Sequence, residues 1–201
     1  YGSGARGFTA GSTSLGTTYS DYNTNQHHSY NCFFRYDPSM QSDTNYPLLW
    51  IVKPNTADSS TSYYGGMQIA VWRGGLTQTG KIYTGLYNVS GGSNVHGTTQ
   101  TSTVTSGDTW YMCTSEITYG SSGNIKMYLN GSLNVTSSTA DNTGTGGSSG
   151  YLGLGESYAT NAAYNYGGMT FGVSHAWFGT ALTATDVTNL WNFYKADYGL
   201  S

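Results

Sequence analysis

The chain has 201 residues, only 8% of them charged, and a formal net charge of −3. Its seven Lys and Arg residues are scattered singly, so no basic face is expected, which argues against nucleic acid and anionic lipid as partners. No apolar run approaches the roughly 18 residues that a membrane-spanning helix needs. The length fits one domain over residues 1–201. The Gly-, Ser-, Thr-, Asn- and Tyr-rich composition is typical of proteins outside cells.

Short runs of alternating apolar and polar residues, separated by Gly, Ser, Asn and Pro clusters, predict many antiparallel strands. The run SYNCFFRY places four apolar side chains, those of Tyr30, Cys32, Phe34 and Tyr36, on one face. In chain order, strands are expected at 29–36, 46–53, 65–73, 81–89, 109–117, 124–130, 151–156 and 169–178. This number of short strands predicts an all-β sandwich or barrel.

The pair Asn130-Gly131 begins at the last residue of the run NIKMYLN. In this run Ile125, Met127 and Leu129 share one face, and Lys126 and Tyr128 share the other. Asn-Gly readily accepts positive φ at both central positions of a type I′ turn. We therefore expect a tight hairpin here, with the following run, SLNV, as its second strand.

One segment breaks the β pattern and predicts a single short helix. Thr183 can cap it together with Asp186, and Leu182 and Val187 stand where a hydrophobic staple belongs. The helix is expected to end near Gly199. Its apolar face is formed by Val187, Leu190, Trp191 and Tyr194.

The order of parts over residues 109–194 resembles the second half of a laminin G-like or pentraxin-like domain. These parts are the Trp-led strand TWYMCTSEI, the strand ending in Asn-Gly, the strand YLGLGE, and the aromatic strand leading into LTATDVTNLW. The resemblance implies an all-β, concanavalin A-like jelly-roll sandwich of two antiparallel sheets with one short helix near the C-terminus. It also implies a disulfide between Cys32 and Cys113, the alternative being two separate buried thiols.

Catalysis by paired carboxylates is not expected, because the only two Glu residues, Glu116 and Glu156, have no acidic neighbours at the spacing that β-glucanases use. His175 alternates with apolar residues of its strand, which predicts a hydrogen-bonded core histidine rather than a ligand. His27 and His28 are neighbours and should point to opposite faces of a strand, which makes a poor metal pair. The sequence therefore predicts a protein that is not an enzyme.

The resemblance also implies calcium as a cofactor, because domains of these families often bind it through loop carboxylates and amides. The residues that fall near the corresponding places are Asp58 and Glu156. Two carboxylates make a weak site, and ordinary solvated loops are the alternative.

Sugar binding can instead rest on aromatic rings beside amides and hydroxyls. Loop residues of this kind are Tyr63, Tyr64, Tyr158, Tyr164, Tyr166 and Asn161, whereas the five Trp residues are expected in the core. The alternative for the loop tyrosines is packing against a neighbouring copy of the chain or another domain. Three sequons, at Asn88, Asn130 and Asn134, are candidate glycosylation sites.

These features favour a non-catalytic recognition or adhesion module that is extracellular, secreted or displayed on a virion or cell surface, with a glycan as its ligand. The main alternative is a structural subunit or decoration protein of a virion, filament or surface layer, whose partners are neighbouring copies in a homo-oligomer or larger assembly. A polysaccharide-degrading enzyme is the third possibility.

Overall fold

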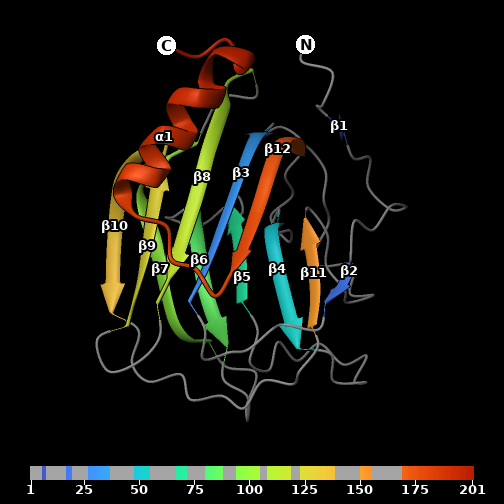
Figure 1. Ribbon diagram of the computed structural model, residues 1–201, viewed down its shortest axis with the longest axis vertical. Helices are drawn as coiled ribbons and strands as arrows, with labels where there is room; N and C mark the ends of the chain where they lie inside the picture. The colour runs from blue at the N-terminus through green and yellow to red at the C-terminus, as the bar shows by residue number, and fades with distance from the viewer. Residues whose placement is uncertain are drawn as a thin grey trace.

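The computed structural model describes residues 6–7, 17–19, 27–36, 48–54, 67–71, 80–87, 94–104, 108–118, 123–138, 150–154 and 169–201. Within these residues, two antiparallel sheets face each other, and a helix lies on the outside of one of them (Figure 1). This arrangement confirms the predicted jelly-roll sandwich of two antiparallel sheets with one short helix near the C-terminus.

The sheet that carries the helix has six strands and is called here the helix-covered sheet. Its strands, in spatial order, are β1 (Arg6–Gly7), β12 (Met169–Phe178), β3 (His28–Tyr36), β8 (Trp110–Ile117), β9 (Asn124–Leu129) and β10 (Ser132–Ser138). The second sheet also has six: β2 (Thr17–Tyr19), β11 (Gly150–Leu154), β4 (Leu48–Pro54), β5 (Met67–Val71), β6 (Lys81–Tyr87) and β7 (Asn94–Thr103). All eight predicted strands are present, and the sequence pattern did not predict the short strands β1 and β2 or the longer strand β7.

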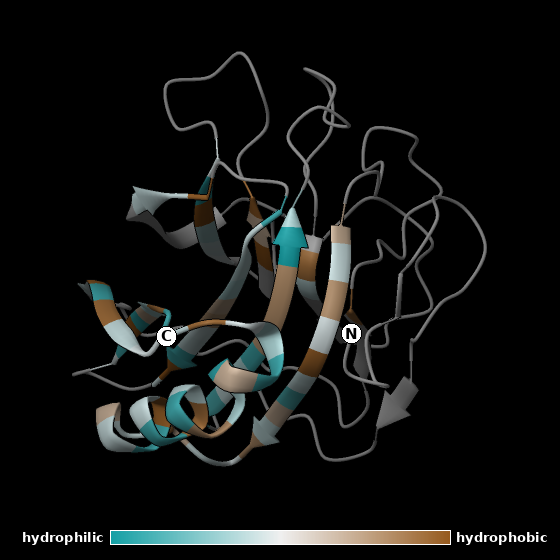
Figure 2. Cartoon of the chain, turned by 90° about the horizontal axis from the view of Figure 1, so that it is seen from above, coloured by the Kyte–Doolittle hydropathy of each residue, from teal (hydrophilic) through white to brown (hydrophobic). Residues whose placement is uncertain are grey.

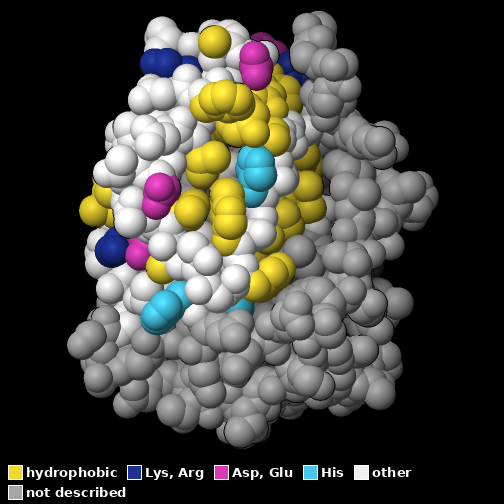
Figure 3. Space-filling view, in the orientation of Figure 1, with side chains coloured by type: hydrophobic (Ala, Val, Ile, Leu, Met, Phe, Trp, Pro, Cys, Tyr) yellow, Lys and Arg dark blue, Asp and Glu magenta, His cyan; other side chains and the backbone are white. Residues whose placement is uncertain are grey.

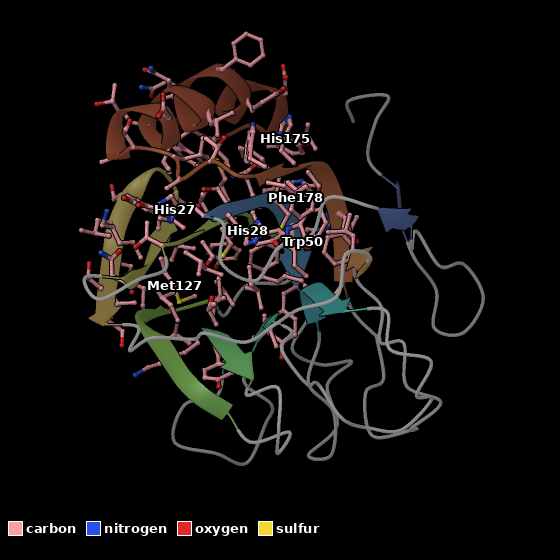
Figure 4. The ribbon with its side chains drawn as sticks, turned by 60° about the horizontal axis from the view of Figure 1, so that its bottom comes forward. His27, His28, Trp50, Met127, His175 and Phe178 are labelled. Atoms are coloured by element: carbon pink, nitrogen blue, oxygen red, sulfur yellow. The ribbon has the colours of Figure 1, made fainter. Side chains whose placement is uncertain are left out.

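The main core lies between the two sheets. As predicted, Tyr30, Cys32, Phe34 and Tyr36 of β3 all point into it and are buried. Figure 4 shows Trp50 and Met127 among the side chains between the sheets. One polar contact crosses this core, a 3.2 Å hydrogen bond between the Thr84 and Ser115 hydroxyls, so both buried hydroxyls are satisfied.

A second apolar cluster lies on the outer face of the helix-covered sheet, beneath α1 (Ala184–Tyr194) and the 3₁₀ helix η2 (Lys195–Tyr198). Its buried members are Phe33, Met112, Tyr128, Leu182 and Val187. Figure 2 shows α1 and η2 on the outside of the sandwich, with hydrophobic and hydrophilic residues on different sides of the helical turns. The amphipathic pattern of the helix is therefore what attaches it to the sheet.

The ends of the helical segment are as predicted. The Thr183 hydroxyl accepts a 3.2 Å hydrogen bond from the Asp186 N–H, and the Thr183 N–H donates to the Asp186 carboxylate at 2.8 Å, which completes a capping box. Gly199 ends η2 with a φ of 69°, a left-handed conformation that favours glycine. No described helix is both long and apolar enough to cross a membrane.

The predicted Asn130-Gly131 turn is confirmed, with φ values of 51° and 80°. The Met112 N–H donates a 2.9 Å hydrogen bond to the Asn130 side-chain oxygen, and the Asn130 N–H donates to the Met112 carbonyl at the same distance. The Thr188 hydroxyl in α1 donates to the Gly131 carbonyl at 3.3 Å. The turn therefore extends the sheet towards β8 and holds the helix at the same time.

The disulfide implied by the resemblance is not supported by the structure. Cys32 and Cys113 are directly opposite each other on β3 and β8, but both are free and buried. Opposed residues on neighbouring strands typically have Cβ atoms about 4.5–5.5 Å apart, at or beyond the upper end of the range of about 3.5–4.5 Å found in disulfides. The two strands hold two packed thiols side by side without a bond.

Candidate ligand-binding pocket

A pocket of about 380 Å³ opens beside α1 on the outer face of the helix-covered sheet. The described residues that line it are Trp177, Leu182, Asp186, Asn189, Leu190 and Phe193. The last four lie at helical spacing on one side of α1, so a single stripe of the helix forms one wall. Trp177 at the end of β12 and Leu182 in the following segment form the other.

A bulge in β12 decides which side chains face the pocket. The pairing of β12 with β3 shifts between Phe171 and Ser174. Phe171 therefore faces the main core, whereas Val173 and Trp177 pack in the outer cluster. Because a bulge adds one residue to a strand, it moves the following side chains to the opposite face.

The segment after β12 is fixed to the sheet by Ser29 in β3. The Ser29 hydroxyl donates to the Thr180 carbonyl at 3.1 Å and accepts from the Leu182 N–H at 2.9 Å. Ser29 itself is buried. These two bonds hold Leu182 against the sheet and set the distance between β12 and the start of α1.

Aromatic rings gather around the pocket. His175 stacks on Trp177 at 5.2 Å between ring centroids and 21° between planes, and it lies 5.7 Å from the Tyr194 ring. Phe193 makes an edge contact with Tyr194 and is 74% exposed. Figure 3 shows hydrophobic side chains gathered on this face of the molecule, over α1 and β12. An exposed aromatic patch of this kind is a feature of binding surfaces.

Among the described residues that line the pocket, Asp186 is the only one with a charge. Its Oδ2 atom accepts hydrogen bonds from the Thr183 hydroxyl at 2.7 Å and the Thr183 N–H at 2.8 Å. These bonds lower the pKa of Asp186, so its carboxylate is ionised at neutral pH.

His175 differs from its prediction as a hydrogen-bonded core residue. It is half-buried on the outer face beside α1 (Figure 4), and its Nδ1 atom has no hydrogen-bond partner among the described residues. Burial lowers its pKa. The bulge in β12 is the reason for the difference, because it removes His175 from the face that Phe171 shares with the core.

The other described carboxylate of interest, Glu116, lies away from the pocket and has a structural environment. It is 3% exposed, and its two oxygens accept hydrogen bonds from Lys126 at 3.0 Å and from the Tyr128 hydroxyl at 3.2 Å. Burial, together with the Glu116 charge, raises the pKa of Tyr128 to about 12. These two hydrogen bonds therefore compensate for the burial of the Glu116 carboxylate.

Of the two neighbouring histidines, His27 precedes β3 and is exposed, whereas His28 begins β3 and is buried. In the part of the chain that the structure describes, no group of three or more His, Cys, Asp or Glu residues is placed to hold a metal ion. Asp58 and Glu156, the predicted calcium ligands, lie outside the described residues.

The predicted sugar-binding residues also lie outside the described residues: Tyr63, Tyr64, Tyr158, Tyr164, Tyr166 and Asn161, as does the sequon at Asn88. Of the other two sequons, Asn130 is bound to Met112 in the hairpin turn. The side-chain nitrogen of Asn134 donates to the Ser102 hydroxyl at 2.8 Å, which links the edge strands β10 and β7. Their glycosylation stays a prediction.

Sequence reasoning missed the pocket itself, because it assigned Trp177 to the core and Asp186 only to the helix cap. One available signal was Phe193, which lies seven residues after Asp186 and hence on the same side of the helix, away from the predicted apolar face. A large aromatic residue on the polar side of a helix is a reason to expect a contact site.

No protein-family model matches the sequence, and a search of curated proteins finds no match either. Solved structures do match. The botulinum neurotoxin serotype G binding domain aligns with 86% of this chain and 37% of its own, at 14% identity and a TM-score of 0.57. A second structure, the botulinum neurotoxin type G receptor-binding domain, aligns over 90% and 42%, at 14% identity and a TM-score of 0.53.

A heptameric SAP-like pentraxin from Limulus polyphemus aligns with 83% of this chain and 70% of its own, at 15% identity and a TM-score of 0.53. The chain thus spans well under half the length of the neurotoxin chains it matches. These likenesses show the fold, a concanavalin A-like sandwich of the lectin and glucanase type. It is shared with receptor-binding domains of toxins and with a pentraxin.

Proposed function

We propose that this chain is a carbohydrate-recognition module, and that its ligand binds in the pocket between Trp177 and Phe193. The observation that carries the proposal is the pairing of aromatic walls with an amide and a carboxylate in one pocket of about 380 Å³. Aromatic faces pack against the apolar side of a pyranose ring, while the amide of Asn189 and the carboxylate of Asp186 hydrogen-bond its hydroxyls.

The fold supports this proposal, because the solved structures with the same fold include domains described as binding or receptor-binding domains. The composition adds that such a module works outside cells or on the surface of a particle. In the described part of the chain, the arrangement of Glu116 with Lys126 and Tyr128 favours recognition over hydrolysis, since this carboxylate is held by structural partners.

A glycan array followed by isothermal titration calorimetry tests the proposal. Phe193→Ala removes a pocket wall that is 74% exposed, and Leu133→Ala removes a 54% exposed side chain on β10, outside the pocket lining. We expect the first variant to weaken glycan binding by about three- to tenfold, the value of one aromatic contact. The second should bind like the unmodified protein.

The main alternative is a structural subunit that packs against its own copies. The similar structures named above include no virion, filament or surface-layer protein, although the pentraxin among them is a heptamer. Size-exclusion chromatography distinguishes this alternative from the proposal. If no glycan of a broad panel binds and the chain self-associates in a way that Phe193→Ala reverses, the exposed aromatic patch serves assembly and the recognition proposal is wrong.

A further inference from the structure

The charge of the pocket indicates which sugars it selects. We propose that the pocket prefers amine-bearing sugars, such as unacetylated hexosamines, to neutral sugars and rejects acidic sugars, with Asp186 as the discriminating residue. This inference rests on the proposed function and adds the class of ligand to it.

The position of the Asp186 carboxylate is the first argument. Its Oδ2 atom accepts both hydrogen bonds from Thr183, whereas no hydrogen bond from a described residue reaches Oδ1. The capping interaction therefore occupies one carboxylate oxygen and leaves the other for a ligand. An ammonium group donates strongly to such an oxygen, because a charge-assisted hydrogen bond is roughly twice as strong as a neutral one.

The aromatic walls are the second argument. Trp177 and Phe193 line the same pocket as Asp186. The face of an aromatic ring attracts a cation within about 6 Å of its centre, and tryptophan does so most strongly. An amine-bearing sugar can therefore place its ring against one aromatic wall and its ammonium group near both the carboxylate and a ring face.

The surrounding charges do not offset this preference. Three described basic side chains belong to the helix-covered sheet or the helical segment, and each has its own place: Lys126 pairs with Glu116, Arg35 lies over the Trp110 ring, and Lys195 follows the far end of α1. The N-terminus of α1 carries a partial charge of only about +0.5. The Asp186 carboxylate, which lies at the helix cap, already neutralises this partial charge. A carboxylated or sulfated sugar would thus face a full negative charge without a compensating cation.

Calorimetry with three matched oligosaccharide series, made of glucosamine, glucose and glucuronic acid units, tests the inference at pH 6 and low salt. One exposed charge contact changes affinity by roughly two- to fivefold, so we expect about a tenfold span from the amine series to the acidic series. The span should shrink in high salt, because the screening length falls to about 3 Å at 1 M.

Asp186→Asn removes the charge and keeps an oxygen that can accept the capping hydrogen bonds, so the amine preference should disappear and the three series should bind with similar affinities. Two controls accompany it. Thr183→Ala weakens the cap without changing the pocket charge, and Asp108→Asn removes an exposed charge that does not line the pocket. Both should keep the selectivity of the unmodified protein.

Each outcome has one meaning. Equal binding of the three series, or selectivity that survives in Asp186→Asn, overturns this inference and leaves the proposed function intact. Loss of selectivity in Thr183→Ala as well would mean that helix capping, rather than charge, is responsible, and would also overturn it. Failure of all three series and of a broad neutral panel would instead contradict the proposed function.

Discussion

Gly131 of the hairpin turn lies directly against Trp191 of α1. A Cβ atom at Gly131 would stand 2.7 Å from the Cβ of Trp191, closer than side-chain atoms approach each other in proteins, and the φ of Gly131 is 80°. Glycine is therefore required here both by the turn and by the helix. The turn and the helix that forms one wall of the pocket are coupled through this contact.

Gly131→Ala is accordingly expected to destabilise the protein. Left-handed backbone alone costs an alanine about 1–2 kcal/mol, and the displaced helix adds to that. Gly199→Ala is the matched control, because its φ is similar at 69° but nothing lies within 4 Å of the added Cβ. Urea unfolding should show a larger loss for Gly131→Ala, and equal losses in the two variants would contradict the contact with Trp191.

The state of the two cysteines gives a second prediction. Burial raises the pKa of Cys113 to about 12, and burial together with the neighbouring Cys113 raises the pKa of Cys32 well above its ordinary value. A thiol-specific reagent should therefore count two thiols per denatured chain. In the folded protein at pH 8 the reaction should be on the order of a thousandfold slower than with an ordinary thiol, because little thiolate exists.

A count of no thiols in denaturant, restored to two by a reducing agent, would contradict this state of the cysteines. Fast reaction in the folded protein would contradict their burial, which leaves Cys32 0% and Cys113 2% exposed.

Most of the fold could be predicted from the sequence because most of its strands alternate between core and outer residues. The exceptions are the short strands β1 and β2 and the ten-residue strand β7. The β7 residues NVHGTTQTST contain almost no apolar side chains, so no period of two marks this strand. It forms because β6 offers a free edge for backbone hydrogen bonds, which is a tertiary effect.

The pocket could not be predicted in the same way, because a bulge interrupts the alternation in β12. The signal for such a bulge is Gly172, a glycine inside a strand. Its Cα faces the Tyr198 ring, and the Tyr198 hydroxyl accepts a 2.6 Å hydrogen bond from the Val173 N–H. This contact depends on η2, which is distant in sequence from the bulge. A local sequence pattern therefore cannot predict it.

The ion pair between Lys126 and the buried Glu116 gives a third prediction. Lys126→Met leaves the Glu116 charge buried with only the Tyr128 hydroxyl as its partner, and we expect a loss of about 1–3 kcal/mol in the free energy of unfolding. The loss in the free energy of unfolding should fall in the lower part of this range, because Lys126 is 32% exposed and water screens the pair.

The double variant Glu116→Gln with Lys126→Met should recover part of this loss, since it removes the uncompensated charge. A double-mutant cycle by urea unfolding measures the coupling between the two residues. Strictly additive effects would mean that the 3.0 Å contact contributes nothing to stability.

The last prediction concerns pH and His175. Burial lowers the pKa of His175 below its ordinary value of 6.5, so the unfolded chain binds a proton at this residue more readily than the folded protein does. The contribution of neutral His175 to the free energy of unfolding is therefore complete above pH 6.5. It is lost as the pH falls from there towards the lower pKa of the folded state. His175→Gln, which does not titrate, should lose less stability than the unmodified protein between pH 7.5 and pH 5. Identical pH profiles for His175→Gln and the unmodified protein would show that the burial of His175 does not resist its protonation, and that another group sets the acid limit of the fold.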